Sequence, residues 1–414
     1  MLTLVPALVR VTLISPRWRV PAERVSKEVI TLTGQEVPTS QSAFFGDNAL
    51  KLGVFCLNVS GGMMLSGAAK PKLDWDENAA VAKVADETGW EFLLPIGRWR
   101  GHGGKYNANA EQYECFTWAA AIAALTSRIH VFSTCHVPIF HPMLAAKMGA
   151  TIDNISGGRW GLNIVAGWNA AEFGMFGIEQ LPHDDRYAQA AEWLDIMEQL
   201  WAKHGELDYQ GRFYDIKRGY LEPKPVQQPR PLVVSAGMSP AGLDFAITRA
   251  DYCFVGSNNW DLLEDTIARS RAQAAALNRE LNTLTFCTVV VKDTEEEAKR
   301  YFEWYVDELG DFETAERLAG NIVKGGAESL PRELLTQQAR ALIAGWGALP
   351  LVGTAEQVAE QLARLQGIGF SGVALGWLDY SEGISRFNAE VLPLLQRAGL
   401  RSGKQPDPVS AATA

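Results

Sequence analysis

Asn163 is the residue of this chain whose surroundings point most directly to chemistry. It lies inside the apolar run 160–166, which is bounded by glycines on both sides and is typical of a buried parallel strand. A buried amide without a partner costs about 1–3 kcal/mol, so we expect Asn163 to meet another polar group. That group is either a neighbour in the core, which makes Asn163 structural, or a ligand at the mouth of a barrel.

Two histidines follow apolar runs of the same kind and carry the side chain most often used as a general base. His102 lies in the glycine-rich loop 101–104, and His136 lies at the end of another run. Each imidazole can serve as a base or as a donor to a substrate, and each can equally be structural. His130, His136 and His141 also suggest a set of metal ligands. We expect no metal site, because no HExxH motif or paired-carboxylate spacing accompanies them.

The segment that follows the run holding Asn163 contains residues suited to an anion. Arg186 offers a planar fork of N–H donors and Tyr187 beside it offers a hydroxyl, a combination that fits a phosphate group. The alternative is a surface ion pair between Arg186 and Asp184 or Asp185. Both interpretations stay open on the sequence alone.

Two glycine-containing segments differ in what they can bind. Residues 235–240 place Gly237 and Ser239 after a strand and before a helix that begins at Pro240, and such a helix N-terminus binds phosphate. Residues 156–161 also hold glycines, but they precede a strand, whereas a dinucleotide-binding loop follows a strand and opens a helix. We therefore interpret 156–161 as a tight turn between a helix and a strand.

These residues must be positioned by a regular alternation of strands and helices. The predicted strands are 50–57, 91–96, 129–135, 160–166, 231–236, 252–256, 284–291 and 372–377, and the predicted helices include 76–89, 114–127, 143–155 and 354–367, the last opening with a capping box. Eight strands over about 340 residues predict an α/β fold, a (β/α)8 barrel with insertions after strand 4 (167–230) and strand 7 (292–370). A doubly wound open sheet is the alternative.

Composition narrows the class of protein. The 414 residues are 47% hydrophobic and 21% charged, enough for a sizeable core. The net charge of −10 argues against nucleic-acid and anionic-membrane partners, and no run approaches the roughly 18 apolar residues of a membrane span. The five cysteines are odd in number and lack CxxC spacing, which is typical of a reducing compartment, so we expect a cytoplasmic protein.

Three segments are predicted along the chain. Residues 1–48 show no clear periodicity and form an extension or arm, 49–402 form the barrel domain, and 403–414 form a flexible tail. The first 20 residues lack the basic leading segment and the clean cleavage site of a signal peptide.

Taken together, the motifs resemble those of the bacterial-luciferase-like flavin monooxygenases. The resemblance covers about residues 50–400, and within that family it is strongest to the dimethylsulfone, alkanesulfonate and pyrimidine-ring-opening branch. The string TIDxISGGRxxxNxVxGW is highly specific for the family. The matching segments are Asn58–Gly62, Arg98–Arg100, Ala150–Arg159, Asn163–Trp168, His183–Tyr187 and Pro223–Pro225.

This resemblance implies a barrel that binds reduced FMN supplied by a separate flavin reductase, activates O2 and oxygenates a small organic substrate. A sulfone, a sulfonate or a nitrogen heterocycle is implied, with C–S or C–N bond cleavage, and so is a homodimer or homotetramer. Thr134 and Asn163 are implied to flank the flavin ring and the O2 site. The full set of expected flavin-binding residues is Gly97, Arg98, Thr134, Asn163, Glu172, Arg186, Tyr187, Gly237 and Ser239.

The chain departs from the family pattern in two places, of which the first concerns the contact with the flavin and the second leaves the substrate open. Gly97 differs from the family at its position, and the relatives most similar at 58–62 have neither His102 nor His136. A reactive flavin needs a dry site, so we expect two or three aromatic residues to face it. The candidates are Trp99, Trp168, Trp377, Phe55 and Phe140.

Two other functions remain open for the same barrel. One is a deazaflavin- or NAD(P)-dependent oxidoreductase that transfers a hydride instead of oxygenating its substrate. The other is a flavin-binding carrier without catalysis. The long connection 292–370, which we expect to cover the site as a lid, argues against a simple carrier.

Overall fold

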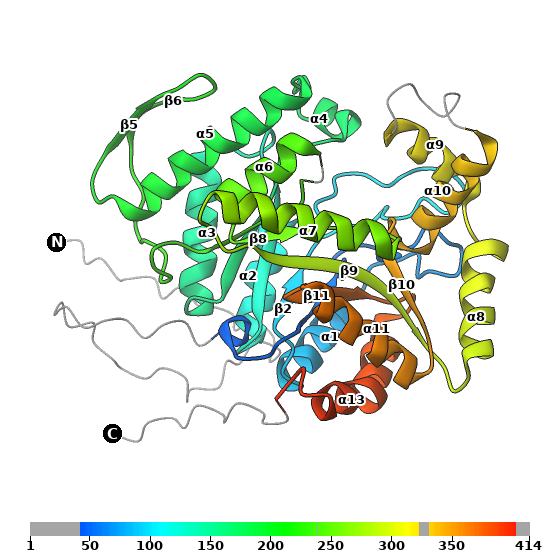
Figure 1. Ribbon diagram of the computed structural model, residues 1–414. Helices are drawn as coiled ribbons and strands as arrows, with labels where there is room; N and C mark the ends of the chain where they lie inside the picture. The colour runs from blue at the N-terminus through cyan, green and yellow to red at the C-terminus, as the bar shows by residue number, and fades with distance from the viewer. Residues whose placement is uncertain (1–41, 238, 323–330, 403–414) are drawn as a thin grey trace, which may run out of the picture. The chain divides into compact units, whose positions relative to one another are not determined.

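Eight parallel strands close into a barrel in the computed structural model, which describes residues 42–237, 239–322 and 331–402 (Figure 1). Because β8 pairs with β9 as well as with β7, the row of strands closes on itself, and the predicted barrel is confirmed over the open-sheet alternative. Around the ring the strands are β1 (Lys51–Phe55), β2 (Phe92–Leu94), β3 (His130–His136), β4 (Trp160–Val165), β7 (Leu232–Ser235), β8 (Tyr252–Phe254), β9 (Asn282–Val291) and β11 (Gly372–Gly376). Each predicted strand overlaps one of them, although β3 ends one residue later and β9 begins two residues earlier than predicted.

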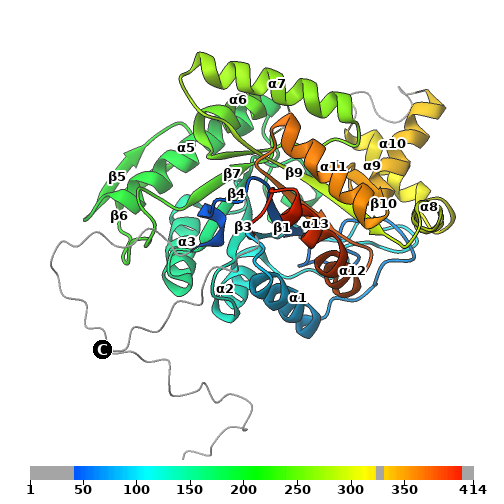
Figure 2. The ribbon, with the colours of Figure 1, turned by 60° about the horizontal axis from the view of Figure 1, so that its bottom comes forward.

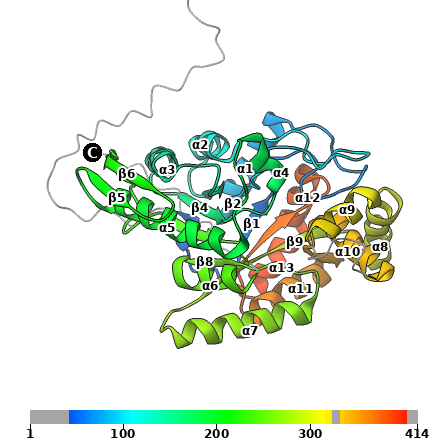
Figure 3. The same cartoon turned by 90° about the horizontal axis from the view of Figure 1, so that it is seen from above.

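Helices surround the strands on the outside, as Figure 3 shows from above. Those that follow single strands are α1 (Trp75–Glu87), α2 (Cys115–Leu125), α3 (Pro142–Ser156), α6 (Pro240–Arg249), α7 (Trp260–Ala276) and α11 (Ala355–Ile368). Thr354 and Gln357 form the predicted capping box of α11, although that helix ends at Gly369 and not at Gly367. After α3, Gly157 and Gly158 have φ of 65° and 87°, the left-handed conformation that the predicted tight turn requires.

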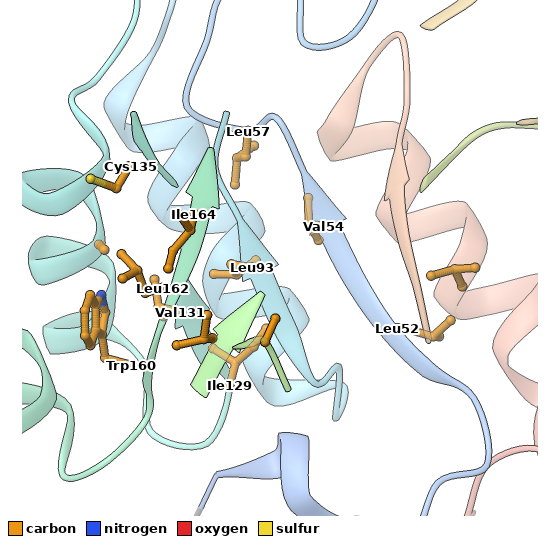
Figure 4. Packing of buried hydrophobic residues seen from close by; sticks show 14 of the residues in the cluster. Leu52, Val54, Leu57, Leu93, Ile129, Val131, Cys135, Trp160, Leu162 and Ile164 are labelled. Atoms are coloured by element: carbon orange, nitrogen blue, oxygen red, sulfur yellow. The ribbon is translucent and has the colours of Figure 1, made fainter. Parts of the chain in front are cut away.

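The strands alternate between two environments. In β4, Leu162 and Ile164 point toward the helices and pack with Val131 and Leu93, as Figure 4 shows from close by. Because successive side chains of a strand point to opposite faces, Asn163 between them points into the barrel. The same alternation in β3 turns Thr134 inward.

Aromatic side chains fill the barrel toward the N-terminal ends of its strands. The 3-10 helix η3 (Ala43–Phe45) carries Phe44, whose ring lies 5.6 Å from those of both Phe92 and Phe132 and 5.0 Å from that of Tyr252. This end is therefore packed shut, and the opposite end is where polar side chains enter the barrel. Of the predicted arm 1–48 and tail 403–414, residues 1–41 and 403–414 lie outside the described residues.

The two long connections have secondary structure of their own. The first contains α4 (Ala170–Met175), α5 (His183–Ala202) and the antiparallel pair β5 (Leu207–Gln210) and β6 (Asp215–Gly219). The second contains α8 (Glu295–Glu303), the π-helix η4 (Trp304–Glu308), α9 (Phe312–Ile322), α10 (Arg332–Gly345) and β10 (Leu349–Gly353), which lengthens the sheet beside β9. After β11 come α12 (Tyr380–Arg386), the π-helix η6 (Phe387–Val391) and α13 (Leu392–Arg397), seen from below in Figure 2.

Two features of the described residues bear on the expectations from composition. All five cysteines are buried and free, and burial raises the pKa of each thiol. In the described ranges, every helix is too short or too polar to span a membrane.

Candidate functional site

The centre of the candidate site is a pair of side chains on adjacent strands. Thr134 and Asn163 are directly opposite each other in the register of β3 and β4. Asn163 Nδ2 donates a hydrogen bond to Thr134 Oγ1 over 3.1 Å, and that hydroxyl donates to the carbonyl of Pro95 over 2.5 Å. The polar partner expected for Asn163 is thus Thr134. Asn163 Oδ1 is buried and has no partner, so one acceptor remains free inside the barrel.

Gly97, in the loop after β2, lies close to the side chains of His136 and Thr134. A Cβ at position 97 would lie 2.9 Å from His136 Cε1 and 3.2 Å from Thr134 Cγ2, closer than real Cβ contacts normally come. Any other residue would therefore push His136 or Thr134 away from its place. Gly97 departs from the family pattern, and the imidazole of His136 lies where a side chain at position 97 would begin.

Arg98 follows Gly97 and is only 5% exposed. Its guanidinium carbon lies 5.1 Å from the centroid of the Trp168 ring and 4.8 Å from that of Trp346, at the distance of cation–π contacts. Its Nε is buried without a partner. Burial lowers the pKa of the guanidinium, and the carboxylate of Glu172 works in the opposite direction.

Glu172, in α4, is the acidic residue of the site and is 1% exposed. Its Oε1 accepts a hydrogen bond from the backbone N–H of Trp99 over 3.2 Å, and its Oε2 is buried without a partner. Burial raises the pKa of this carboxyl, and the charge of Arg98 opposes that rise. The site therefore holds one carboxyl and one guanidinium, each with unused hydrogen-bonding capacity.

His102 and His136 both lie at this end of the barrel and are both buried. Burial, and then the charge of Arg98, lowers the pKa of each imidazole to about 3, so both are neutral at physiological pH. His102 is hydrogen-bonded to Asn109 over 3.2 Å, and its ring lies 4.6 Å from that of Trp346. A neutral imidazole can accept a proton or orient a ligand, but it brings no positive charge.

The other two histidines lie elsewhere. His130 begins β3 at the closed end of the barrel, where its Nδ1 is 3.0 Å from the hydroxyl of Ser42. His141 caps α3 by accepting a hydrogen bond from the N–H of Met143. These two and His136 do not converge, and the described part of the chain holds no group of three His, Cys, Asp or Glu residues suited to a metal ion.

A second group of expected residues meets at the first turn of α6. Ser239 caps the helix by accepting a hydrogen bond from the N–H of Gly242 over 3.2 Å. A Cβ at position 242 would lie 2.4 Å from the Tyr187 hydroxyl and 2.7 Å from Gly237 Cα, so this turn needs glycine for the chains to come so close. The result is a helix N-terminus with two hydroxyls beside it, a geometry suited to a phosphate.

Arg186 connects the two groups. It donates a hydrogen bond to the carbonyl of Gly167, the residue before Trp168, and its Nε is buried without a partner. Among the described residues Asp185 pairs with Arg212 at 2.8 Å and Asp184 with His183 at 2.8 Å. The interpretation of Arg186 as a surface ion pair therefore does not hold.

Trp346 is a site residue that sequence reasoning missed. It ends α10 in the left-handed conformation, with φ of 57°, which is uncommon for a residue other than glycine. From the second long connection it reaches over both Arg98 and His102. The glycines on either side of it, Gly345 and Gly347, were the available signal, since they allow an abrupt helix end.

The aromatic residues expected around the site divide into two groups. Trp168 is partly exposed and lies over Arg98, and Trp99 packs against Phe176 in α4 at 4.9 Å. Phe140 lies against Trp99. Trp377 is a candidate that packs in the core instead, against Trp90 and Phe387. Phe55 packs edge-on against Phe254 and at a tilt against Phe286 inside the barrel.

Five buried polar atoms without a partner gather in this region. Each unpaired buried polar group costs about 1–3 kcal/mol, and native proteins keep few of them. Their concentration on the loops after β2 and β4 and on the second long connection is what a binding site for a polar ligand requires. The atoms are Arg98 Nε, Asn163 Oδ1, Glu172 Oε2, Arg186 Nε and Trp346 Nε1.

Comparison with known proteins gives a consistent result. Residues 50–372 match the family described as luciferase-like monooxygenase. The chain is 31% identical over 358 residues to the pyrimidine monooxygenase RutA of Acinetobacter baylyi, which covers 84% of this chain and 95% of that protein. It is 30% identical over 359 residues to the FMNH2-dependent dimethylsulfone monooxygenase of Pseudomonas fluorescens, with the same coverage of 84% and 95%.

Solved structures share the fold at lower identity. A riboflavin lyase, RcaE, determined with modified FMN and riboflavin, superposes with a TM-score of 0.78 at 20% identity and covers 87% of this chain and 94% of its own. DmoA from Hyphomicrobium sulfonivorans gives a TM-score of 0.74 at 20% identity, with 87% and 91% covered. At these identities the comparison establishes a common architecture.

Proposed function

Because this chain belongs to the luciferase-like monooxygenase family, we propose that it is a two-component monooxygenase that takes reduced FMN from a separate flavin reductase. Its substrate is a small organic molecule of the sulfone, sulfonate or nitrogen-heterocycle class, oxygenated with C–S or C–N bond cleavage. Two relatives, a pyrimidine monooxygenase and a dimethylsulfone monooxygenase, support that range. The observation that carries the proposal is the cluster of unpaired polar atoms at the open end of the barrel, where such enzymes build their sites.

The first turn of α6 is suited to the phosphate of FMN. Ser239 and the free N–H groups of the turn provide donors, and the helix dipole favours an anion there. The Tyr187 hydroxyl lies against the same turn, and Gly237 keeps the backbone open to it. Arg186 completes the set with a guanidinium whose Nε is unpaired. A doubly charged phosphate satisfies these donors, which fits FMN.

The other end of the site is suited to the flavin ring. Reduced FMN, when bound, supplies the two electrons that activate O2. Asn163 and Thr134 are the groups that we propose to stand beside the ring and the O2 site, with Asn163 Oδ1 free to accept a hydrogen bond. Glu172 lies near them with one free carboxylate oxygen. None of the three is a strong base or nucleophile at neutral pH, so their role is to orient and stabilise by hydrogen bonds.

Exclusion of water is the second task of the chain. Activated oxygen species on a flavin are lost to water, so the site must be covered. Trp168 and Trp346, which come from the two long connections, both lie over Arg98 and bring apolar surface to the mouth of the barrel. The neutral imidazoles of His102 and His136 line the site without adding charge.

We also propose that the protein is a homodimer or homotetramer. Leu125 in α2 and Leu144 and Ile155 in α3 are exposed to 40%, 53% and 49%. Apolar side chains of this size on neighbouring outer helices favour burial against a second copy.

The test is oxygen incorporation. The protein is incubated with NADH, FMN, a generic flavin reductase and a panel of sulfones, sulfonates and pyrimidines under 18O2, and products are analysed by mass spectrometry. We expect one product to carry one labelled oxygen, only when reductase and FMN are both present. A protein that binds FMN but gives no labelled product with any member of the panel is a carrier. Tighter binding of a deazaflavin than of FMN points to hydride transfer.

A further inference from the structure

Arg98 is a buried cation without the partners that such a group normally has. It is 5% exposed, and the described residues give it neither a hydrogen bond nor an ion pair within 4.0 Å. Taking a charge out of water costs several kcal/mol unless ion pairing or hydrogen bonds offset it. Within the described part of the chain, the guanidinium contacts two aromatic rings. We therefore expect this guanidinium to bind a group that the chain itself does not supply.

Its surroundings leave the N–H donors of the guanidinium without a hydrogen-bond partner. The planes of Trp168 and Trp346 meet at 62°, and the guanidinium lies over both rings. Because an aromatic face offers no strong hydrogen-bond acceptor, these contacts leave the N–H donors unpaired, and the Nε donor is buried as well. An edge of parallel N–H donors matches two oxygens of one carboxylate or sulfonate.

The charges around Arg98 favour an anion. Both nearby histidines are neutral at physiological pH, so neither adds to nor cancels its charge. Among the described residues, Glu172 is the carboxyl that acts on Arg98 electrostatically, and it makes no ion pair with Arg98 within 4.0 Å. The Glu172 Oε1 atom is already bonded to the backbone N–H of Trp99. The guanidinium edge is therefore available to an incoming group.

We propose that Arg98 is the receptor for a negatively charged oxygen group of the substrate, a carboxylate or a sulfonate, with Trp168 and Trp346 holding its guanidinium in orientation. This inference rests on the proposed function and narrows its substrate class, which includes neutral sulfones and heterocycles as well as sulfonates, to anions.

The position of Arg98 favours the substrate over the flavin as the source of that group. Apart from Gly97 and Arg98 itself, which the resemblance places beside the flavin, the residues expected to bind FMN come from β3, β4, α4, α5 and the start of α6. Trp346, whose ring contacts both Arg98 and His102, comes from the second long connection. His102 comes from the loop after β2. Arg317 of α9 donates a hydrogen bond to the carbonyl of His102, so the second long connection also fixes the loop beside Arg98. These elements form a separate wall of the site.

The experiment compares matched anionic and neutral probes on the FMN-loaded full chain by calorimetric titration. The pairs are acetate and acetamide, methanesulfonate and dimethyl sulfone, and benzoate and benzamide. We expect at least one anion to bind about tenfold or more tightly than its neutral partner. Arg98→Met should abolish that preference, and FMN affinity should stay within a few-fold. Arg100→Met, which removes an exposed arginine two residues away, should keep the preference.

Stability provides an independent readout. Arg98→Met removes an unpaired buried cation and retains a long apolar side chain, so its melting temperature should equal or exceed that of wild type. Arg98→Lys is a second variant that keeps a cation in place but loses the planar fork. We expect it to bind the anion severalfold more weakly than wild type while still preferring it to the neutral probe.

Three outcomes would overturn the inference. In the first, wild type binds no anion more tightly than its neutral partner. In the second, Arg98→Met or Arg98→Lys binds the anion as wild type does. In the third, Arg98→Met leaves the anion preference intact but weakens the binding of reduced FMN by tenfold. That result would make Arg98 a ligand of the flavin and not of the substrate. If no variant and no wild type binds FMN, it is the proposed function that fails.

Discussion

Asn163 donates a hydrogen bond to Thr134 across the strand pair β3–β4, and the Thr134 hydroxyl donates its own hydrogen bond to the carbonyl of Pro95. The chain of bonds fixes both side chains and leaves Asn163 Oδ1 as the single free acceptor of the pair. A fixed, unpaired polar group inside a barrel is suited to electrostatic stabilisation, since it needs no reorganisation when the ligand reacts.

We therefore predict that Asn163→Ala and Thr134→Ala bind FMN within a few-fold of wild type but lose substrate oxygenation by about a hundredfold or more. Electrons from NADH should then appear as H2O2 instead of product. The measurements are FMN affinity, product per NADH and melting temperature on the same proteins. A purely structural role predicts a lower melting temperature with the product yield unchanged, and that result would remove the pair from the mechanism.

Arg186→Ala tests the phosphate end of the site. Removing one charge-assisted hydrogen bond should weaken FMN binding by about 1.5–3 kcal/mol, because the guanidinium has an unpaired Nε and no competing carboxylate. Quenching of flavin fluorescence measures the affinity. Arg212→Ala is the control, since Arg212 pairs with Asp185 on the surface and should not affect the flavin. Equal affinities for Arg186→Ala and wild type would contradict the assignment.

Gly242 offers a steric test of the same turn. An added Cβ would lie 2.4 Å from the Tyr187 hydroxyl and 2.7 Å from Gly237 Cα, so Gly242→Ala must displace the hydroxyl or the backbone. We expect FMN affinity to fall about tenfold or more. Gly367→Ala, in α11, is the control because nothing lies within 4 Å of its Cβ. If Gly242→Ala binds FMN as Gly367→Ala does, Tyr187 is not part of the cradle.

The barrel and the central pair were accessible from the sequence because both depend on local pattern. The apolar runs that form the eight strands are short and bounded by turn residues, and alternation within Trp160–Val165 turns Asn163 away from the helices. The strand β10 was missed because Pro350 interrupts a run that alternates poorly. The hairpin β5–β6 was missed because most of its side chains are polar or exposed.

The wall around Arg98 could not be predicted because it is made by tertiary contact. Trp346 lies about 250 residues beyond Arg98 in the chain, and only the closure of the barrel brings the two together. The sequence predicted Arg98 as a neighbour of the flavin by resemblance, but its lack of hydrogen bonds is visible only when its surroundings are known. The same holds for Trp377, whose place after a barrel strand is shared by core and site residues alike.

Assembly can be tested on the outer helices. We expect wild type to be a dimer or tetramer at micromolar concentration by light scattering. The double variant Leu144→Asp, Ile155→Asp places two charges on the exposed face of α3 and should be monomeric, because burying an unpaired carboxylate in an interface costs several kcal/mol. Leu277→Asp, which changes an exposed leucine just after α7, is the control. A monomeric wild type would refute the proposal.

The buried histidines predict how stability depends on pH. Their folded-state pKa of about 3 lies below the unfolded value of about 6.5, so the unfolded chain binds more protons as the pH falls. The stability contributed by keeping them neutral is therefore present above pH 6.5 and is lost progressively toward pH 3. Between pH 7.5 and pH 5, each of His102 and His136 should lower the free energy of unfolding by about 2 kcal/mol.

Replacing one of these histidines with a neutral residue should reduce that loss. We expect the free energy of unfolding of His136→Gln, measured by urea denaturation, to fall by about 2 kcal/mol less than that of wild type between pH 7.5 and pH 5. His102→Gln should behave similarly, because the same two causes, burial and the charge of Arg98, keep its imidazole neutral. His204→Gln is the control, since His204 is exposed on the surface and should leave the pH dependence close to that of wild type. An identical loss in all four proteins would show that the pKa of His102 and of His136 is not lowered by folding, and both imidazoles would then be protonated at pH 5 in the folded protein.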